Sequence, residues 1–140
     1  MRTTITSYIL FLSVFIVACD RQSIDEPQTS ATCEKNTHCQ FANDVEIWLS
    51  NSAISPETPF SINLKLPPNA YNVSAKLEGV TMYMGYIPLQ FTQKGSYWSA
   101  QTMVGVCSEP VMTWKMTVVF TDAQNRQQSV FYYFDSRHAV

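Results

Sequence analysis

A strict alternation of apolar and polar side chains between residues 112 and 120 most constrains the fold of this chain. The apolar positions are Met112, Trp114, Met116, Val118 and Phe120, with Thr113, Lys115 and Thr117 between them. Successive side chains of a β-strand point to opposite faces, so this period of two predicts a strand with one buried and one wet face. No stretch of the chain shows convincing helical spacing.

The same period recurs along the chain from Val45 onward. It predicts further strands at residues 45–49, 60–66, 71–77, 87–91, 97–101 and 130–134. Pro88 indicates an edge position, because proline cannot donate a hydrogen bond to the sheet. About seven strands, with turn signals at roughly ten-residue spacing, predict an all-β antiparallel sandwich of immunoglobulin-like type. A small closed β-barrel is the alternative.

The amino terminus has the composition of a secretory signal. Positive charge at Met1 and Arg2 precedes an apolar run from Tyr8 to Ala18. Such a run of about 11 residues is roughly 16 Å long as a helix, against the roughly 30 Å of a bilayer core. A charged start, a short apolar run and a small residue at Ala18 predict a cleaved signal peptide over residues 1–18 and not a transmembrane helix.

The segment Ile16-Val17-Ala18-Cys19 resembles the lipobox of bacterial lipoproteins. The resemblance implies cleavage before Cys19, a diacylglyceryl thioether on its sulfur, and a palmitate-type acyl chain on the new amino terminus; an ordinary cleaved signal is the alternative. Several acyl chains would make membrane anchoring stable. Asp20 resembles an inner-membrane retention signal in some lineages, with the outer membrane as the alternative. Residues 19–32 are polar and read as a flexible tether, which leaves residues 33–140 for the sandwich domain.

Three further cysteines would then lie in an oxidising envelope. Cys33 and Cys39 close a short loop with easy geometry, whereas a pairing of either one with Cys107 would close a much longer loop. An odd number indicates one disulfide and one remaining thiol, and the sequence leaves the pairing open. The surroundings of Cys107 favour a disulfide over a role as ligand or nucleophile.

Sulfur-containing side chains recur in two segments, residues 81–86 and 107–114. On a strand, Met82 and Met84 would point to one face, and Met112 would share a face with Trp114. Thioethers and thiolates are soft ligands that suit Cu(I). We therefore expect that Met82, Met84, Met112 and Cys107 could converge at one end of the sandwich, with Trp114 shielding the ion. Methionine is also a common core filler, so packing is the competing interpretation.

The pattern Met82-x-Met84-Gly85, Val106-Cys107 and Met112-x-Trp114, downstream of the Cys33/Cys39 pair, resembles an uncharacterised family of small Gram-negative envelope lipoproteins. Members of that family are found near SCO-type copper chaperones of cytochrome oxidase maturation. The resemblance covers residues 33–120. It implies a link to copper handling or oxidase assembly and marks the same four sulfur residues and Trp114 as positions of interest, without an assigned activity.

Composition and spacing argue against several other classes of function. The net charge of −2 and the absence of any Lys/Arg cluster argue against nucleic-acid binding. No His lies between Cys107 and Met112, so a blue-copper site fails, and His38 and His138 are expected to face solvent. Known catalytic motifs are absent. We expect a non-enzymatic, periplasm-facing accessory module attached to the membrane through its lipid, with an envelope protein as possible partner. The alternative is a structural or protein-interaction lipoprotein without metal.

Overall fold

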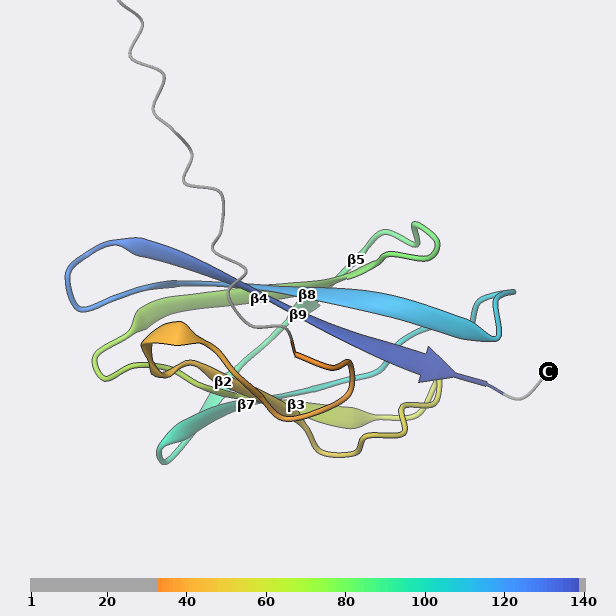
Figure 1. The fold of residues 1–140 in the computed structure, drawn as a ribbon, viewed down its shortest axis with the longest axis horizontal. Coiled ribbons are helices and arrows are strands. Elements are labelled where there is room, and N and C mark those ends of the chain that lie inside the picture. Colours follow the sequence, from red (N-terminus) through yellow and green to blue (C-terminus); the bar gives the residue numbers. More distant parts are fainter. Residues whose placement is uncertain (1–32, 139–140) are drawn as a thin grey trace, which may run out of the picture.

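The computed structural model describes residues 33–138 and consists of two β-sheets packed face to face (Figure 1). One sheet has five strands in the order β1-β2-β3-β7-β6, and the other has four in the order β5-β4-β8-β9. The elements are β1 (Cys39–Gln40), the 3-10 helix η1 (Ala42–Asp44), β2 (Glu46–Leu49), β3 (Phe60–Lys65), β4 (Tyr71–Gly79), β5 (Tyr86–Leu89), β6 (Thr92–Lys94), β7 (Tyr97–Thr102), β8 (Val111–Thr121) and β9 (Gln127–Arg137).

This strand order is that of an immunoglobulin-like sandwich. If β2, β3, β7 and β6 are taken as strands A, B, E and D, the first sheet reads A-B-E-D, with β1 added outside strand A. In the second sheet β4, β8 and β9 correspond to C, F and G, and β5 lies at the edge beside C. The paired strands within both sheets are antiparallel. The predicted immunoglobulin-like sandwich is therefore confirmed, and the barrel alternative is not adopted.

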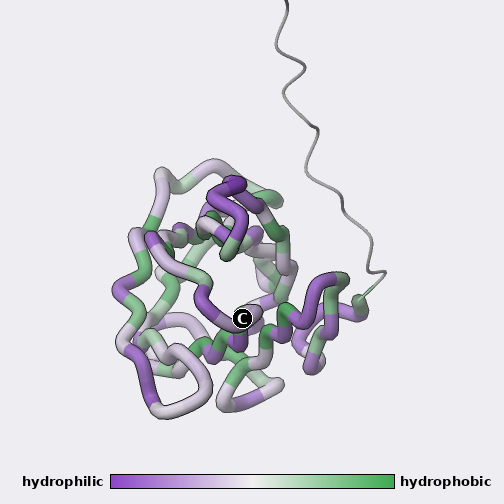
Figure 2. Tube along the Cα trace, turned by 90° about the vertical axis from the view of Figure 1, so that its left-hand side faces the viewer, coloured by the Kyte–Doolittle hydropathy of each residue, from purple (hydrophilic) through white to green (hydrophobic). Residues whose placement is uncertain are grey.

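The alternating residues of both sheets fill the space between them. Along β8 every second side chain is buried, from Met112 to Phe120, and the residues between are partly exposed. Ile62 and Leu64 of β3, in the facing sheet, are fully buried, and so is Leu77 of β4, which lies beside β8 in the same sheet. The view in Figure 2 shows hydrophobic and hydrophilic positions alternating along the chain trace. The period of two seen in the sequence thus produces the core directly.

The structure has nine strands where seven were predicted. The additional strands are β1, with two residues, and β6, with three, and both are too short to show a period. The predicted face of β4 also fails at its start, because a register shift separates Tyr71 from Ser74 and leaves Tyr71 exposed. Pro88 does lie on an edge strand, β5, as predicted.

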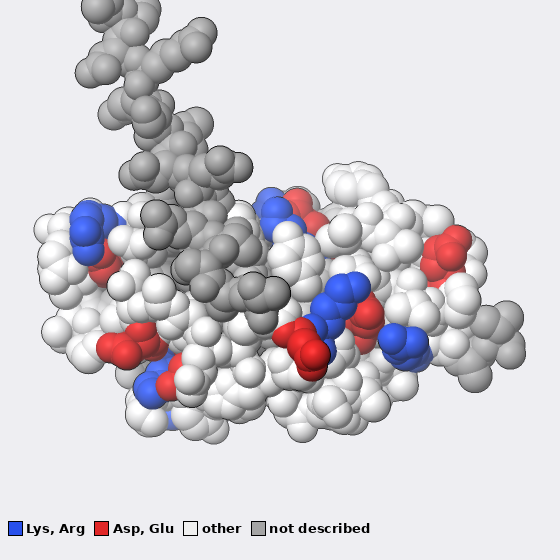
Figure 3. Space-filling view, viewed as in Figure 1, with Lys and Arg blue, Asp and Glu red and all other residues white. Residues whose placement is uncertain are grey.

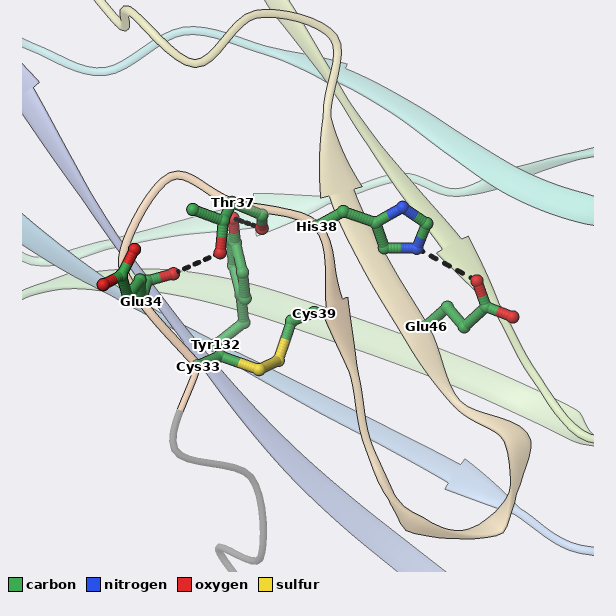
Figure 4. Close-up of a disulfide and its surroundings, with 7 residues drawn as sticks. All are labelled: Cys33, Glu34, Thr37, His38, Cys39, Glu46 and Tyr132. Carbon is green, nitrogen blue, oxygen red and sulfur yellow. Dashed lines mark hydrogen bonds and ion pairs between the residues drawn. A yellow bond between two sulfur atoms is a disulfide. The ribbon is translucent and has the colours of Figure 1, made fainter.

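A disulfide between Cys33 and Cys39 closes the loop that leads into β1 (Figure 4). The Cα atoms of this pair are 5.6 Å apart, and Cys39 is fully buried. Among the alternatives left open by the sequence, the structure thus adopts the short pairing. Cys107 is a free thiol within the described residues, so the disulfide favoured for it is not formed.

The disulfide loop covers part of the edge strand β9. The side-chain amide of Asn36 donates to the backbone carbonyl of Asp135 at 2.8 Å, and its oxygen accepts from the Asp135 N–H at 2.7 Å. The hydroxyl of Tyr132 donates to the carbonyl of Thr37 at 2.8 Å (Figure 4). These contacts satisfy backbone groups that an uncovered edge would leave to water or to another chain.

The predicted signal peptide, Cys19, Asp20 and the tether all lie outside the described residues. Between residues 33 and 138, no helix has the length and apolar character needed to cross a bilayer.

Candidate functional site

Two loops meet at one end of the sandwich and bring the sulfur-containing residues together. Residues 80–85 connect β4 to β5, and residues 103–110 connect β7 to β8; both lie at the right in Figure 1. The first loop is fastened to β8 because the Val80 N–H donates to the Thr113 carbonyl at 2.8 Å and the Thr113 N–H donates to Thr81 Oγ1 at 3.0 Å. The second is fastened at Val104, whose carbonyl accepts from the Glu57 N–H at 2.8 Å.

The central contact at this end joins the thiol of Cys107 to the thioether of Met82. Their sulfur atoms are 3.5 Å apart, although the residues are 25 positions apart in sequence. Met82 is 42% exposed and Met84 is 41% exposed, so neither residue is part of the buried core. The methyl group of Met84 lies over Gly105, two residues before Cys107. The predicted convergence of Met82, Met84 and Cys107 at one end of the sandwich therefore agrees with the geometry.

The route to this convergence differs from the predicted one. Met82 and Met84 were expected to share a face of a strand, but they lie in the loop between β4 and β5. Gly85, directly after Met84, has a φ of 76° and turns the chain toward β5. The spacing of two residues therefore does not place both side chains on one face, because this segment is a loop and not a strand of the sheet.

Met112 and Trp114 do not belong to the exposed sulfur site. Met112 is only 2% exposed, on the core-facing side of β8, so its predicted role as a ligand gives way to the packing interpretation. Trp114 is buried on the same face, and its indole N–H donates to Ser136 Oγ at 3.0 Å inside the core. The predicted shielding role of Trp114 is therefore not supported. The accessible set reduces to Met82, Met84 and Cys107.

Exposed apolar side chains lie in the same two loops as the sulfur atoms. In the same two loops and at the start of β5 lie Val80, Tyr83, Tyr86, Met103 and Val106, each at least half exposed. We refer to these five residues as the apolar rim. Figure 3 shows charged side chains only singly or in small groups of mixed sign, with uncharged surface between them. Such a group of exposed apolar side chains is typical of a surface that contacts a partner or a ligand.

The histidines do not approach the sulfur pair by any contact in the described residues. His38 is exposed as predicted, and its Nε2–H donates a hydrogen bond to the Glu46 carboxylate at 3.0 Å (Figure 4). His138, at the end of the described part, is only partly exposed. Among residues 33–138, no three or more His, Cys, Asp and Glu side chains are grouped as metal ligands.

A hollow beside the disulfide loop was not predicted from the sequence. It has a volume of about 520 Å³ and is lined in part by Lys35, Asn36, Asp135 and Arg137. Burial raises the pKa of Asp135, but hydrogen bonds from Thr113 and Lys35 outweigh that effect, so its pKa lies below the usual value of 3.8. Lys35 Nζ is 2.9 Å from the Asp135 carboxylate. These charged groups pair with one another, which indicates a structural clamp between the loop and β9.

Comparisons with known proteins add a likeness of fold. No protein-family model matches the chain, and no curated protein sequence matches it. Among solved structures, the chain resembles the crystal structure of a DUF4426 family protein from Pseudomonas aeruginosa PAO1. The TM-score is 0.51 at 17% sequence identity, over 74% of this chain and 96% of that one. At this level of identity the likeness concerns the β-sandwich alone.

Proposed function

We propose that this chain is a lipid-anchored, non-enzymatic binding module of the cell envelope that holds Cu(I) at Met82 and Cys107. The observation that carries the proposal is the 3.5 Å separation of the two sulfur atoms. Two sulfur ligands of a tetrahedral metal ion, each with a metal–sulfur bond of about 2.3 Å, lie about 3.8 Å apart. A shift of the two sulfur atoms by a few tenths of an ångström would therefore admit an ion between them. Thiolate and thioether donors select Cu(I) over harder metals.

Met84 is the third donor in this proposal. It is not part of the buried core, and its methyl group already lies over Gly105 of the loop that carries Cys107. The two loops would then close around the ion from both sides. With two or three sulfur donors and partly exposed side chains, such a site leaves the ion open to exchange, as a module that receives and passes on copper in oxidase assembly requires.

A competition titration with a colorimetric Cu(I) chelator tests the metal site. Under anaerobic conditions, with ascorbate as reductant so that the disulfide persists, we expect one Cu(I) per chain. Met82→Leu and Cys107→Ser should each weaken binding at least about tenfold, equivalent to about 1.4 kcal/mol.

Met116→Leu is the matched control for that titration, because Met116 is fully buried in the core and far along β8 from the loops. Leucine conserves most of the volume of methionine, so the fold should persist in both leucine variants. Equal affinity of wild type and Met82→Leu would refute the proposed site.

The membrane anchor is the second part of the proposal and rests on the lipobox at residues 16–19. Wild-type protein should sediment with membranes and incorporate labelled palmitate in growing cells. Cys19→Ser should lose the label and leave the membrane fraction, because no acyl chain remains to hold it. Cys107→Ser serves as control and should keep the label. Persistent labelling of Cys19→Ser would rule out this anchor.

A protein-interaction module without metal is the second candidate, and the apolar rim favours it. Tyr83 is 81% exposed and Tyr86 65%, which is unusual for side chains of this size unless they contact a partner. The edge strands of the four-stranded sheet are less suited to pairing, because β5 contains Pro88 and β9 is partly covered by Asn36. Under this alternative, crosslinking to an envelope partner survives Met82→Leu and Cys107→Ser but is lost in Tyr83→Ser.

A further inference from the structure

The glycine at position 79 is not required by a turn. It is the last residue of β4, opposite Trp114 of β8, and its φ lies outside the left-handed region. Any residue could adopt this backbone conformation, so the reason for glycine is space. By the alternation of the strand, position 79 faces the core on the same side as the buried Leu77.

Two groups of the candidate site occupy the space that a side chain at Gly79 would fill. A Cβ at this position would collide with the carbonyl oxygen of Met82, and it would lie 2.5 Å from Cε of Met112. Real Cβ atoms do not approach other atoms so closely, so any side chain here would displace the Met82 backbone, the Met112 methyl group, or both. The loop folds back over Gly79 and places Met82 on top of it.

Two hydrogen bonds to Thr113 fix the path of the loop that follows Gly79. Val80 and Thr81 are both tied to Thr113 of β8, as described above, so the chain leaves the strand at a defined place. Three residues after Gly79, the Met82 backbone lies against the glycine and its side chain reaches Cys107. The position of the Met82 sulfur therefore depends on the empty side-chain position at 79 and on the Met112 methyl group beneath the loop.

We propose that Gly79 is a positioning residue that seats Met82 against Cys107, with Met112 as the support of that seat and not a ligand. The contact between the two sulfur atoms needs no metal, whereas its consequence for Cu(I) affinity rests on the proposed function. Residues that orient metal ligands without touching the metal typically change affinity by about 10–100-fold when altered.

The test is Gly79→Ala, examined first without metal by NMR of protein carrying ¹³C-methyl methionine. In the wild type, the Met82 methyl group should show a nuclear Overhauser contact to the β-protons of Cys107, and the Met112 methyl group one to the α-protons of Gly79. In Gly79→Ala the contact between Met82 and Cys107 should disappear while the amide spectrum of the sheets is retained. Cu(I) affinity in the chelator titration should fall at least about tenfold.

Gly105→Ala is the matched control, because a Cβ at Gly105 would lie 3.6 Å from Cε of Met84, an ordinary contact distance. It should keep both the Met82–Cys107 contact and the copper affinity. If Gly79→Ala does not fold, the double variant Gly79→Ala/Met112→Val removes the side-chain collision but keeps the one with the Met82 carbonyl, and it should also lose the contact.

The outcomes separate this inference from the copper proposal. A retained Met82–Cys107 contact in folded Gly79→Ala would overturn the positioning role, whatever happens to copper. Loss of the contact together with weaker copper binding supports both proposals. Loss of the contact in a protein whose wild type binds no Cu(I) supports the positioning role and refutes the copper site.

Discussion

Tyr132 joins the core to the disulfide loop through a hydrogen bond that requires its phenolic proton. The ring is 1% exposed and the hydroxyl donates to the carbonyl of Thr37. Burial raises the pKa of Tyr132 from 10.0 to about 12, because the charged phenolate is poorly solvated there. The contribution of this group to stability is thus fully present below pH 10 and is lost as the pH rises through about 12.

An absorbance titration of the tyrosines tests this shift. Subtracting the curve of Tyr132→Phe from that of the wild type gives the titration of Tyr132 alone. Its midpoint should lie near pH 12, above the usual 10.0. The free energy of unfolding of Tyr132→Phe at neutral pH should be lower by about 1 kcal/mol, the typical contribution of one hydrogen bond. A midpoint near pH 10 would mean that the hydroxyl is exposed to solvent.

The methionines illustrate how far single residues could be interpreted from the sequence. Met112 and Met116 stand in a long alternating segment, and their burial follows from the period alone. Met82 and Met84 are two residues apart, a spacing that also fits one face of a strand, yet they lie in a loop. The signals that distinguish them are the flanking Gly79 and Gly85, one needed for space and one for its positive φ. The spacing of methionines alone, without attention to those glycines, does not distinguish a buried methionine from an exposed one.

Among the elements, strand length decided which were predictable. The seven strands of four or more residues show their period and were all predicted, although the predicted range 130–134 covers only the middle of β9 (Gln127–Arg137). Strands β1 and β6 are defined only by their pairing with the next strand, as in Cys39 with Ile47 and Lys94 with Tyr97. A two-residue strand carries no pattern of its own, so only the tertiary structure defines it.

The role of the disulfide loop was not predicted from the sequence. The sequence predicts only that Cys33 and Cys39 can close a short loop. In the structure, Asn36 and Thr37 pair with the backbone of β9 and the hydroxyl of Tyr132, about a hundred residues away in sequence. Asn36 has a φ of 63°, a conformation that asparagine tolerates better than most residues. Contacts of this separation have no local signature.

At the scale of the whole molecule, the sandwich acts as a scaffold that holds two loops at one end. The fold class followed from the alternation of the strands, since two half-buried sheets have few other ways to cover their apolar faces. The meeting of residues 80–85 with residues 103–110 is a consequence of topology: in this strand order the β4–β5 and β7–β8 connections fall at the same end. The sequence alone predicted that methionine and cysteine form the candidate site, but not which of the methionines belong to it.

Native mass spectrometry of residues 20–140, with and without Cu(I), tests the copper site most directly. The intact mass should correspond to one disulfide and a free Cys107, and added Cu(I) should increase it by the mass of one copper ion. The double variant Met82→Leu/Cys107→Ser should keep the disulfide and bind none. A wild type that binds no copper, or a double variant that binds as much as the wild type, would contradict the proposal.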